Sequence, residues 1–131
     1  MSKIGDFLKE AGTFYLATVD GERPRLRPLG LFIEESGKII FGVGSFKEVY
    51  KQLRANPNAE IVACKPDGRW LRYSGRAVFE TDPKYEAAAL DAAPYLRNVY
   101  NEETGHHLMM FRLEDAEALV IQVMGKGESL L

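Results

Sequence analysis

Three short turn signals divide the first half of the chain into strand-length segments and constrain its fold more than any other feature. They are Asp20-Gly21, Ser36-Gly37 and Asp67-Gly68. Asp-Gly between two strand-like runs is typical of a β-hairpin, which joins antiparallel neighbours. The turns therefore predict a mostly antiparallel sheet, and they argue against the regular strand–helix alternation of a Rossmann fold.

Alternating apolar positions and β-branched residues locate the strands between these turns. We expect strands over residues 13–19, 23–34, 38–43, 59–64, 69–80, 108–113 and 118–124. Six or seven strands of this kind, with helices filling the openings, predict a small antiparallel β-barrel of α+β class. At this length, residues 1–131 are expected to form one domain.

Helix signals occur at four places, and we expect helical segments over residues 2–11, 45–55, 83–93 and 94–100. The second is the most distinctive. Ser45 and Glu48 form an S-x-x-E capping box, so this helix is predicted to begin at Ser45. Asn56-Pro57 ends it.

Composition narrows the class of protein. The single cysteine, Cys64, excludes an internal disulfide and a cysteine metal cluster, and its strand-like surroundings predict a buried side chain. No apolar run approaches the roughly 20 residues of a membrane span. The first residues resemble no cleavable signal. A cytoplasmic protein is therefore expected.

Positive charge is concentrated in the middle of the chain. Residues 23–76 hold 11 Lys/Arg and 5 Asp/Glu, whereas the remainder holds 6 and 14. This excess is too small for a nucleic-acid surface, which is normally far more basic. It suits a small phosphorylated ligand better.

Most catalytic motifs are missing. Gly42-Val43-Gly44 does not continue as a dinucleotide fingerprint, since the third glycine would fall at Lys47. His106 and His107 are adjacent and would point to opposite faces of a strand, so no metal site is expected. There is no G-x-S-x-G elbow, and no carboxylate pair has a spacing suited to acid–base catalysis.

The segment from Ser45 to Lys47 is the remaining candidate site. A helix start offers unpaired N–H groups and a positive dipole end, and Lys47 adds a charge. Arg25 or Arg27, on the strand from residue 23, could complete an anion cradle. The alternative is an ordinary strand-to-helix turn. A phosphate site without catalytic side chains would suit a cofactor that does its own chemistry.

Several ordered segments resemble a known family. They are Thr13-Phe14-Tyr15-Leu16-Ala17-Thr18, Arg27-Pro28-Leu29-Gly30, Gly44-Ser45-Phe46-Lys47 with Gln52-Leu53 and Asn56-Pro57, and Trp70-Leu71-Arg72-Tyr73-Ser74-Gly75-Arg76-Ala77. Together they resemble the pyridoxamine 5′-phosphate oxidase-like, FMN-binding split-barrel proteins, and especially their small general-stress and nitroimidazole-reductase-like members.

The resemblance implies a six-stranded split barrel and a homodimer with FMN at the subunit interface. Arg27, Ser45 and Lys47 would contact the phosphate, the strand from Phe41 to Gly44 would run beside the ribityl chain and ring, and Trp70 would contact the flavin. The expected cofactor-binding set is Arg25, Arg27, Pro28, Leu29, Gly42, Val43, Gly44, Ser45, Lys47 and Trp70.

The chain also departs from the family pattern. Phe46 stands where pyridoxamine oxidases commonly have a second basic residue, and the C-terminal tryptophan–arginine segment of the true oxidases is not found. We therefore expect an FMN-dependent oxidoreductase acting on another small molecule, not pyridoxamine 5′-phosphate oxidase activity. Three alternatives stay open: a non-catalytic flavin carrier or sensor, a haem binder using His106 or His107, and a structural dimer with a vacant site.

Overall fold

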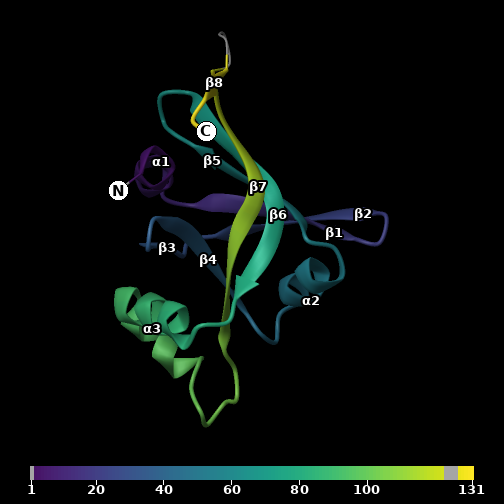
Figure 1. Cartoon of the computed structure of the whole chain (residues 1–131), viewed down its shortest axis with the longest axis vertical. Helices are drawn as coiled ribbons and strands as arrows, with labels where there is room; N and C mark the ends of the chain where they lie inside the picture. The colour runs from purple at the N-terminus through teal and green to yellow at the C-terminus, as the bar shows by residue number, and fades with distance from the viewer. Residues whose placement is uncertain (1, 123–126) are drawn as a thin grey trace.

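Figure 1 shows the computed structural model, which describes residues 2–122 and 127–131. Its strands are β1 (Phe14–Asp20), β2 (Arg23–Leu29), β3 (Phe32–Glu35), β4 (Lys38–Gly44), β5 (Asn58–Cys64), β6 (Arg69–Glu80), β7 (Leu108–Gln122) and β8 (Glu128–Ser129). Its helices are α1 (Lys3–Ala11), α2 (Glu48–Ala55), α3 (Pro83–Ala92) and the 3₁₀ helix η1 (Pro94–Asn98).

The sheet confirms the predicted fold class. Strand order is β2-β1-β5-β6-β7-β4-β3, with β8 beside β7, and the strand pairs are antiparallel throughout the described residues. Figure 1 shows β6 and β7 running side by side along the molecule, with α3 near one end. The described residues hold eight strands, against the six or seven that were predicted.

One predicted strand, residues 23–34, is broken in the structure. β2 ends at Leu29 and pairs with β1, while β3 begins at Phe32 and pairs with β4. Gly30 and Leu31 lie outside both strands and carry the chain from one edge of the sheet to the other, so the predicted strand is divided in two.

Two other predicted strands, residues 108–113 and 118–124, are joined. β7 is continuous from Leu108 to Gln122, and residues 123 and 124 lie outside the described residues. The polar stretch between the two predicted strands is a bulge, because the β6–β7 register shifts between Ser74 and Arg76. Asp115 opposite this shift has a φ of 52°.

Gly75 lies at the bulge, where the backbones of β6 and β7 come close together. A Cβ at this position would lie 2.8 Å from the Glu114 carbonyl oxygen. We expect Gly75→Ala to lower the free energy of unfolding by about 1–3 kcal/mol, since a backbone atom must shift. Gly30→Ala is the control, because its Cβ would meet nothing within 4 Å. Urea denaturation measures both, and equal stabilities would contradict this close approach.

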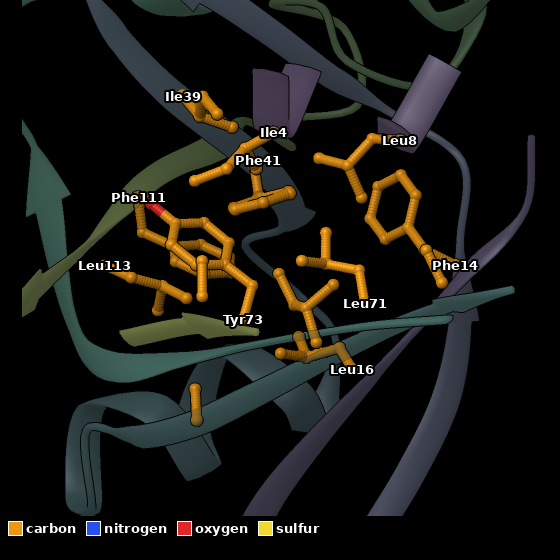
Figure 2. Close-up of a cluster of buried hydrophobic side chains, with 14 of the residues drawn as sticks. Ile4, Leu8, Phe14, Leu16, Ile39, Phe41, Leu71, Tyr73, Phe111 and Leu113 are labelled. Atoms are coloured by element: carbon orange, nitrogen blue, oxygen red, sulfur yellow. The ribbon is translucent and has the colours of Figure 1, made fainter. Parts of the chain in front are cut away.

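Aromatic side chains form the centre of the barrel. Phe14, Phe41 and Phe111 are fully buried, and the Phe41 ring centroid lies 5.6 Å from each of the other two. Figure 2 shows these rings packed with Tyr73 and aliphatic side chains, including Leu8 from α1. This cluster forms the core on which the strands of the barrel pack.

β4 is buried on both faces and links this core to a second cluster. Phe41 and Val43 point into the barrel, whereas Ile40 packs with Tyr85 and Leu108 in a cluster that includes α3. The helix α3 thereby covers the outer side of β4 and the start of β7.

The predicted start of the second helix is wrong. α2 begins at Glu48, and its N-cap residue Lys47 makes no side-chain cap bond. Ser45 does not cap the helix because it continues the pairing of β4 with β7: its hydroxyl oxygen accepts a hydrogen bond from the His107 backbone N–H at 3.0 Å. Its own N–H donates to the His107 carbonyl at 2.8 Å.

Other local predictions have mixed outcomes. Ser2 caps α1 and Asp82 caps α3, as their sequences indicate. The segment after Pro94 is a 3₁₀ helix that ends at Asn98. Cys64 was expected to be buried but is exposed, since Ala63 takes the inward position on β5. No helix in the described part of the chain has the length and apolarity to span a membrane.

Candidate functional site

Arg27 on β2 joins the hairpin to α2 through neutral acceptors. Its Nη1 donates to the Leu16 carbonyl at 3.1 Å and to the Thr18 hydroxyl at 2.8 Å, and its Nη2 donates to the Gln52 side-chain oxygen at 2.7 Å. Thr18 is 3% exposed and itself donates to the same oxygen of Gln52 at 2.6 Å. The guanidinium is therefore held in one orientation.

The charge of Arg27 has no counter-ion within the described residues. Its three hydrogen bonds use three of the five guanidinium N–H groups, and none of the acceptors is a carboxylate. Partial burial lowers the pKa of Arg27 below its ordinary value, and neighbouring Arg25 lowers it further. A bound anion would oppose both effects, so the arrangement fits an anion site.

Lys47 and Ser45 lie on the tight turn that leads into α2. The Lys47 N–H donates to the Gly44 carbonyl at 3.0 Å, which closes the turn. Lys47 is exposed, and its Nζ lies 5.2 Å from the centre of the Phe46 ring. Gly44 is closely packed, since a Cβ there would lie 2.8 Å from the Tyr100 hydroxyl.

The helix α2 connects Lys47 to Arg27 through Gln52. Lys47 is its N-cap, and Gln52, which binds Arg27, lies five residues further on. Five residues correspond to about 7.5 Å along the helix axis. The first turn of α2 also presents backbone N–H groups without partners inside the helix. Arg27, Lys47 and the helix start are therefore all associated with α2.

The other residues predicted to bind the cofactor are less closely associated with Arg27 and Lys47. Arg25 is exposed and paired with Asp20 at 3.1 Å. Pro28 is exposed, and Leu29 is half-buried against the core. Val43 points into the core and is 4% exposed.

Gly42, which was also predicted to bind the cofactor, is closely surrounded by side chains. A Cβ there would lie 3.0 Å from the Met110 sulfur and 3.3 Å from Leu31. The missing side chain of Gly42 therefore makes room for the packing between β4 and the second cluster.

Trp70 stands apart from this region within one chain. Trp70 on β6 pairs with Cys64 on β5. Arg27 on β2 lies in register with Leu16 on β1, Ile61 on β5 and Tyr73 on β6, so three residues of β6 separate the two positions. Three residues of strand correspond to about 10 Å. Because Tyr73 is buried in the core, Trp70 faces the outside of the sheet, where the Arg72 guanidinium lies 5.0 Å from its ring.

Sequence reasoning missed the residues that hold the site. Thr18 and Gln52 were part of the resembling segments but had been given no role. Glu86 was not identified at all, although it accepts from the Leu108 N–H at 2.7 Å and lies 3.3 Å from His107 Nδ1. No local pattern marks these contacts, since each partner lies far away in the sequence.

Two hollows border the β1–β2 hairpin. One, of about 420 Å³, lies between the hairpin tip and α2 and includes Gln52. The other, of about 750 Å³, lies on the outer face of β1, β5 and β6 and is lined by Ala17, Glu60 and Ser74 among others. The described residues contain no group of three His, Cys, Asp or Glu side chains arranged to hold a metal ion.

Comparison with known proteins places these features in a family. A family model described as Pyridoxamine 5′-phosphate oxidase matches residues 1–122. A solved NimC/NimA family protein from Clostridium acetobutylicum is 32% identical, with a TM-score of 0.88 over 98% of this chain and 89% of that one. Comparison with curated protein sequences gives no match.

Two more distant structures share the fold alone. A heme binding protein from Mycobacterium smegmatis is 19% identical, with a TM-score of 0.70 over 94% of this chain and 54% of that one. A pyridoxamine 5′-phosphate oxidase-related, FMN binding protein from Nostoc punctiforme is 16% identical, with a TM-score of 0.59 over 98% and 94%.

Proposed function

The chain belongs to the pyridoxamine 5′-phosphate oxidase family, and we propose that it binds FMN and acts as an oxidoreductase. The observation that carries the proposal is the partly buried guanidinium of Arg27, which has only neutral acceptors and borders the same helix as Lys47. A phosphate dianion would balance these two charges. The FMN binding protein of the same fold supports flavin as the group that carries this phosphate.

The residues present fit a phosphate of this kind. Arg27 has two N–H groups without partners in the described structure, and Lys47 has an exposed ammonium. Ser45 can add a hydroxyl donor from the same turn. Charge-assisted hydrogen bonds of this type are roughly twice as strong as neutral ones.

We also propose that the flavin ring lies at a homodimer interface. The outer face of the sheet carries a row of side chains, Tyr15, Val62, Arg72 and Leu119, aligned across β1, β5, β6 and β7. Tyr15 is 42% exposed in the single chain. A second copy on this face would cover these side chains together with Trp70, which faces the same side of the sheet.

The cofactor would supply the reaction. FMN, when bound, accepts and passes on a hydride or electrons, while the protein binds it, orients it and excludes water. The described residues contain no pair of side chains arranged as nucleophile and base. This supports cofactor chemistry over direct catalysis by side chains, with a small molecule as the acceptor.

FMN is favoured over haem because the charges of Arg27 and Lys47 suit a phosphate dianion, which haem does not carry. His107 Nδ1 lies 3.3 Å from Glu86, and the His106 ring lies 4.1 Å from the Phe46 ring. The Nε2 atom of His107 has no part in its contact with Glu86, so haem ligation is tested directly. A Soret band that disappears in both His106→Ala and His107→Ala would reverse this order.

The proposal is tested by the spectrum and turnover of the purified protein. We expect a flavin absorbance spectrum after addition of FMN, bleaching by a nicotinamide donor, and recovery of the spectrum with a nitro or quinone acceptor. Pyridoxamine 5′-phosphate is expected to be a poor substrate. A flavin that binds but is neither reduced nor reoxidised would identify a carrier or sensor and exclude the oxidoreductase.

A further inference from the structure

The turn that carries Ser45 is held in place by the start of β7. Ser45 and His107 exchange two hydrogen bonds, from the Ser45 N–H to the His107 carbonyl and from the His107 N–H to the Ser45 hydroxyl oxygen. The next pair along the ladder is Gly44 and Leu108. The position of Ser45 is therefore set by His107 and Leu108, which lie 62 and 63 positions later in the chain.

The bond from His107 also determines what the Ser45 hydroxyl can do. A serine hydroxyl has one O–H donor and two acceptor lone pairs. The His107 N–H occupies one lone pair, so the O–H points elsewhere, and it has no acceptor within the described residues. The hydroxyl is thus available to donate to an anion at the turn that also carries Lys47.

Glu86 holds this start of β7 from α3. One carboxylate oxygen accepts from the Leu108 N–H at 2.7 Å, and the other lies 3.3 Å from His107 Nδ1. The helix itself is fixed independently, because Tyr85 and Ala89 are buried against β3, β4 and β7. Glu86 therefore connects a fixed helix to the two residues that place Ser45.

We propose that Glu86 is a positioning residue for the phosphate end of the ligand: through Leu108 and His107 it holds the Ser45 hydroxyl where it donates to the phosphate. The inference rests on the proposed FMN function and deepens it. Its partners are His107 and Leu108, and in this proposal its influence on the ligand passes through Ser45.

The test compares FMN with riboflavin, which has the same ring and ribityl chain but no phosphate. For Glu86→Ala and for Ser45→Ala we expect the preference for FMN over riboflavin to fall about tenfold, the effect of losing one hydrogen bond to a charged group. Riboflavin affinity should be unchanged. The double variant should lose no more than either single one, since both remove the same interaction.

Two further substitutions of Glu86 separate geometry from charge. Glu86→Gln keeps an acceptor for the Leu108 N–H and should retain most of the preference. Glu86→Asp keeps the charge but is one methylene too short to hold both partners, so it should lose the preference as Glu86→Ala does. Glu103→Ala is the matched control, because it removes an exposed carboxylate from the preceding loop and should change nothing.

The outcomes distinguish this inference from the proposed function. An unchanged FMN-to-riboflavin ratio in folded Glu86→Ala and Glu86→Asp would overturn the positioning role while leaving FMN binding intact. An equal loss of both ligands would overturn it as well, since the effect would not act through the phosphate. A natural protein that binds both flavins equally would instead refute the phosphate site itself.

Discussion

Replacing Arg27 and Lys47 together by alanine is expected to weaken FMN binding by roughly 10²- to 10⁴-fold. Each side chain would contribute a charge-assisted hydrogen bond of about 1.5–3 kcal/mol, and about 1.4 kcal/mol corresponds to a factor of ten. The fold should survive, because Thr18 still donates to Gln52 at 2.6 Å when Arg27 is removed. Flavin fluorescence during titration measures the affinities.

Arg25→Ala provides the matched control for this double variant. Arg25 lies on the same strand two residues away, but it is exposed and paired with Asp20. Its removal should change FMN affinity by no more than a few-fold. An affinity that the Arg27/Lys47 double variant leaves unchanged would remove both residues from the site.

Phe41→Ala should cause the largest loss of stability in the chain. Phe41 is fully buried, and its ring lies within 5.6 Å of both Phe14 and Phe111. Truncating such a ring removes its burial energy and leaves a cavity, which costs about 3–5 kcal/mol. Chemical denaturation measures the change in the free energy of unfolding from the midpoint and slope.

Two comparisons define what the Phe41 result means. Phe46→Ala removes the same side chain from a position that is 42% exposed, and it should cost less than about 1 kcal/mol. Phe41→Leu keeps most of the buried apolar surface and should fall between the two. Similar losses for Phe41→Ala and Phe46→Ala would contradict the packing in Figure 2.

Features with a local cause could be predicted from the sequence. Asp20-Gly21 forms the β1–β2 hairpin, in which Asp20 pairs with Arg23. Ser2 and Asp82 cap their helices because each bond is made within the first turn. The inward positions of β6, Leu71, Tyr73 and Ala77, also follow from alternation along the strand.

Features that depend on distant partners could not be predicted in the same way. Ser45 matches a capping box, but its backbone N–H and its hydroxyl oxygen both pair with His107 beside the β4–β7 ladder, and α2 begins at Glu48. The stretch around Asp115 looks like a turn, yet the long β6 partner holds it as a bulge within β7. Local propensity was overridden by tertiary pairing in both cases.

The same distinction between local and distant causes applies to the candidate site. Arg27, Ser45 and Lys47 were predicted as a group, and the structure places them beside the same helix and its leading turn. Thr18, Gln52 and Glu86 complete the group, but only the folded arrangement gives them a role. Trp70 joins the site only if a second chain brings it there.

The central claim is that this chain binds FMN through its phosphate. The most direct measurement is a titration of the ligand-free natural protein with FMN and with riboflavin, in which flavin fluorescence monitors binding. We expect saturation at one FMN per chain with micromolar or tighter affinity, and clearly weaker binding of riboflavin. No change in FMN fluorescence at micromolar protein, or equal affinity for the two flavins, would contradict it.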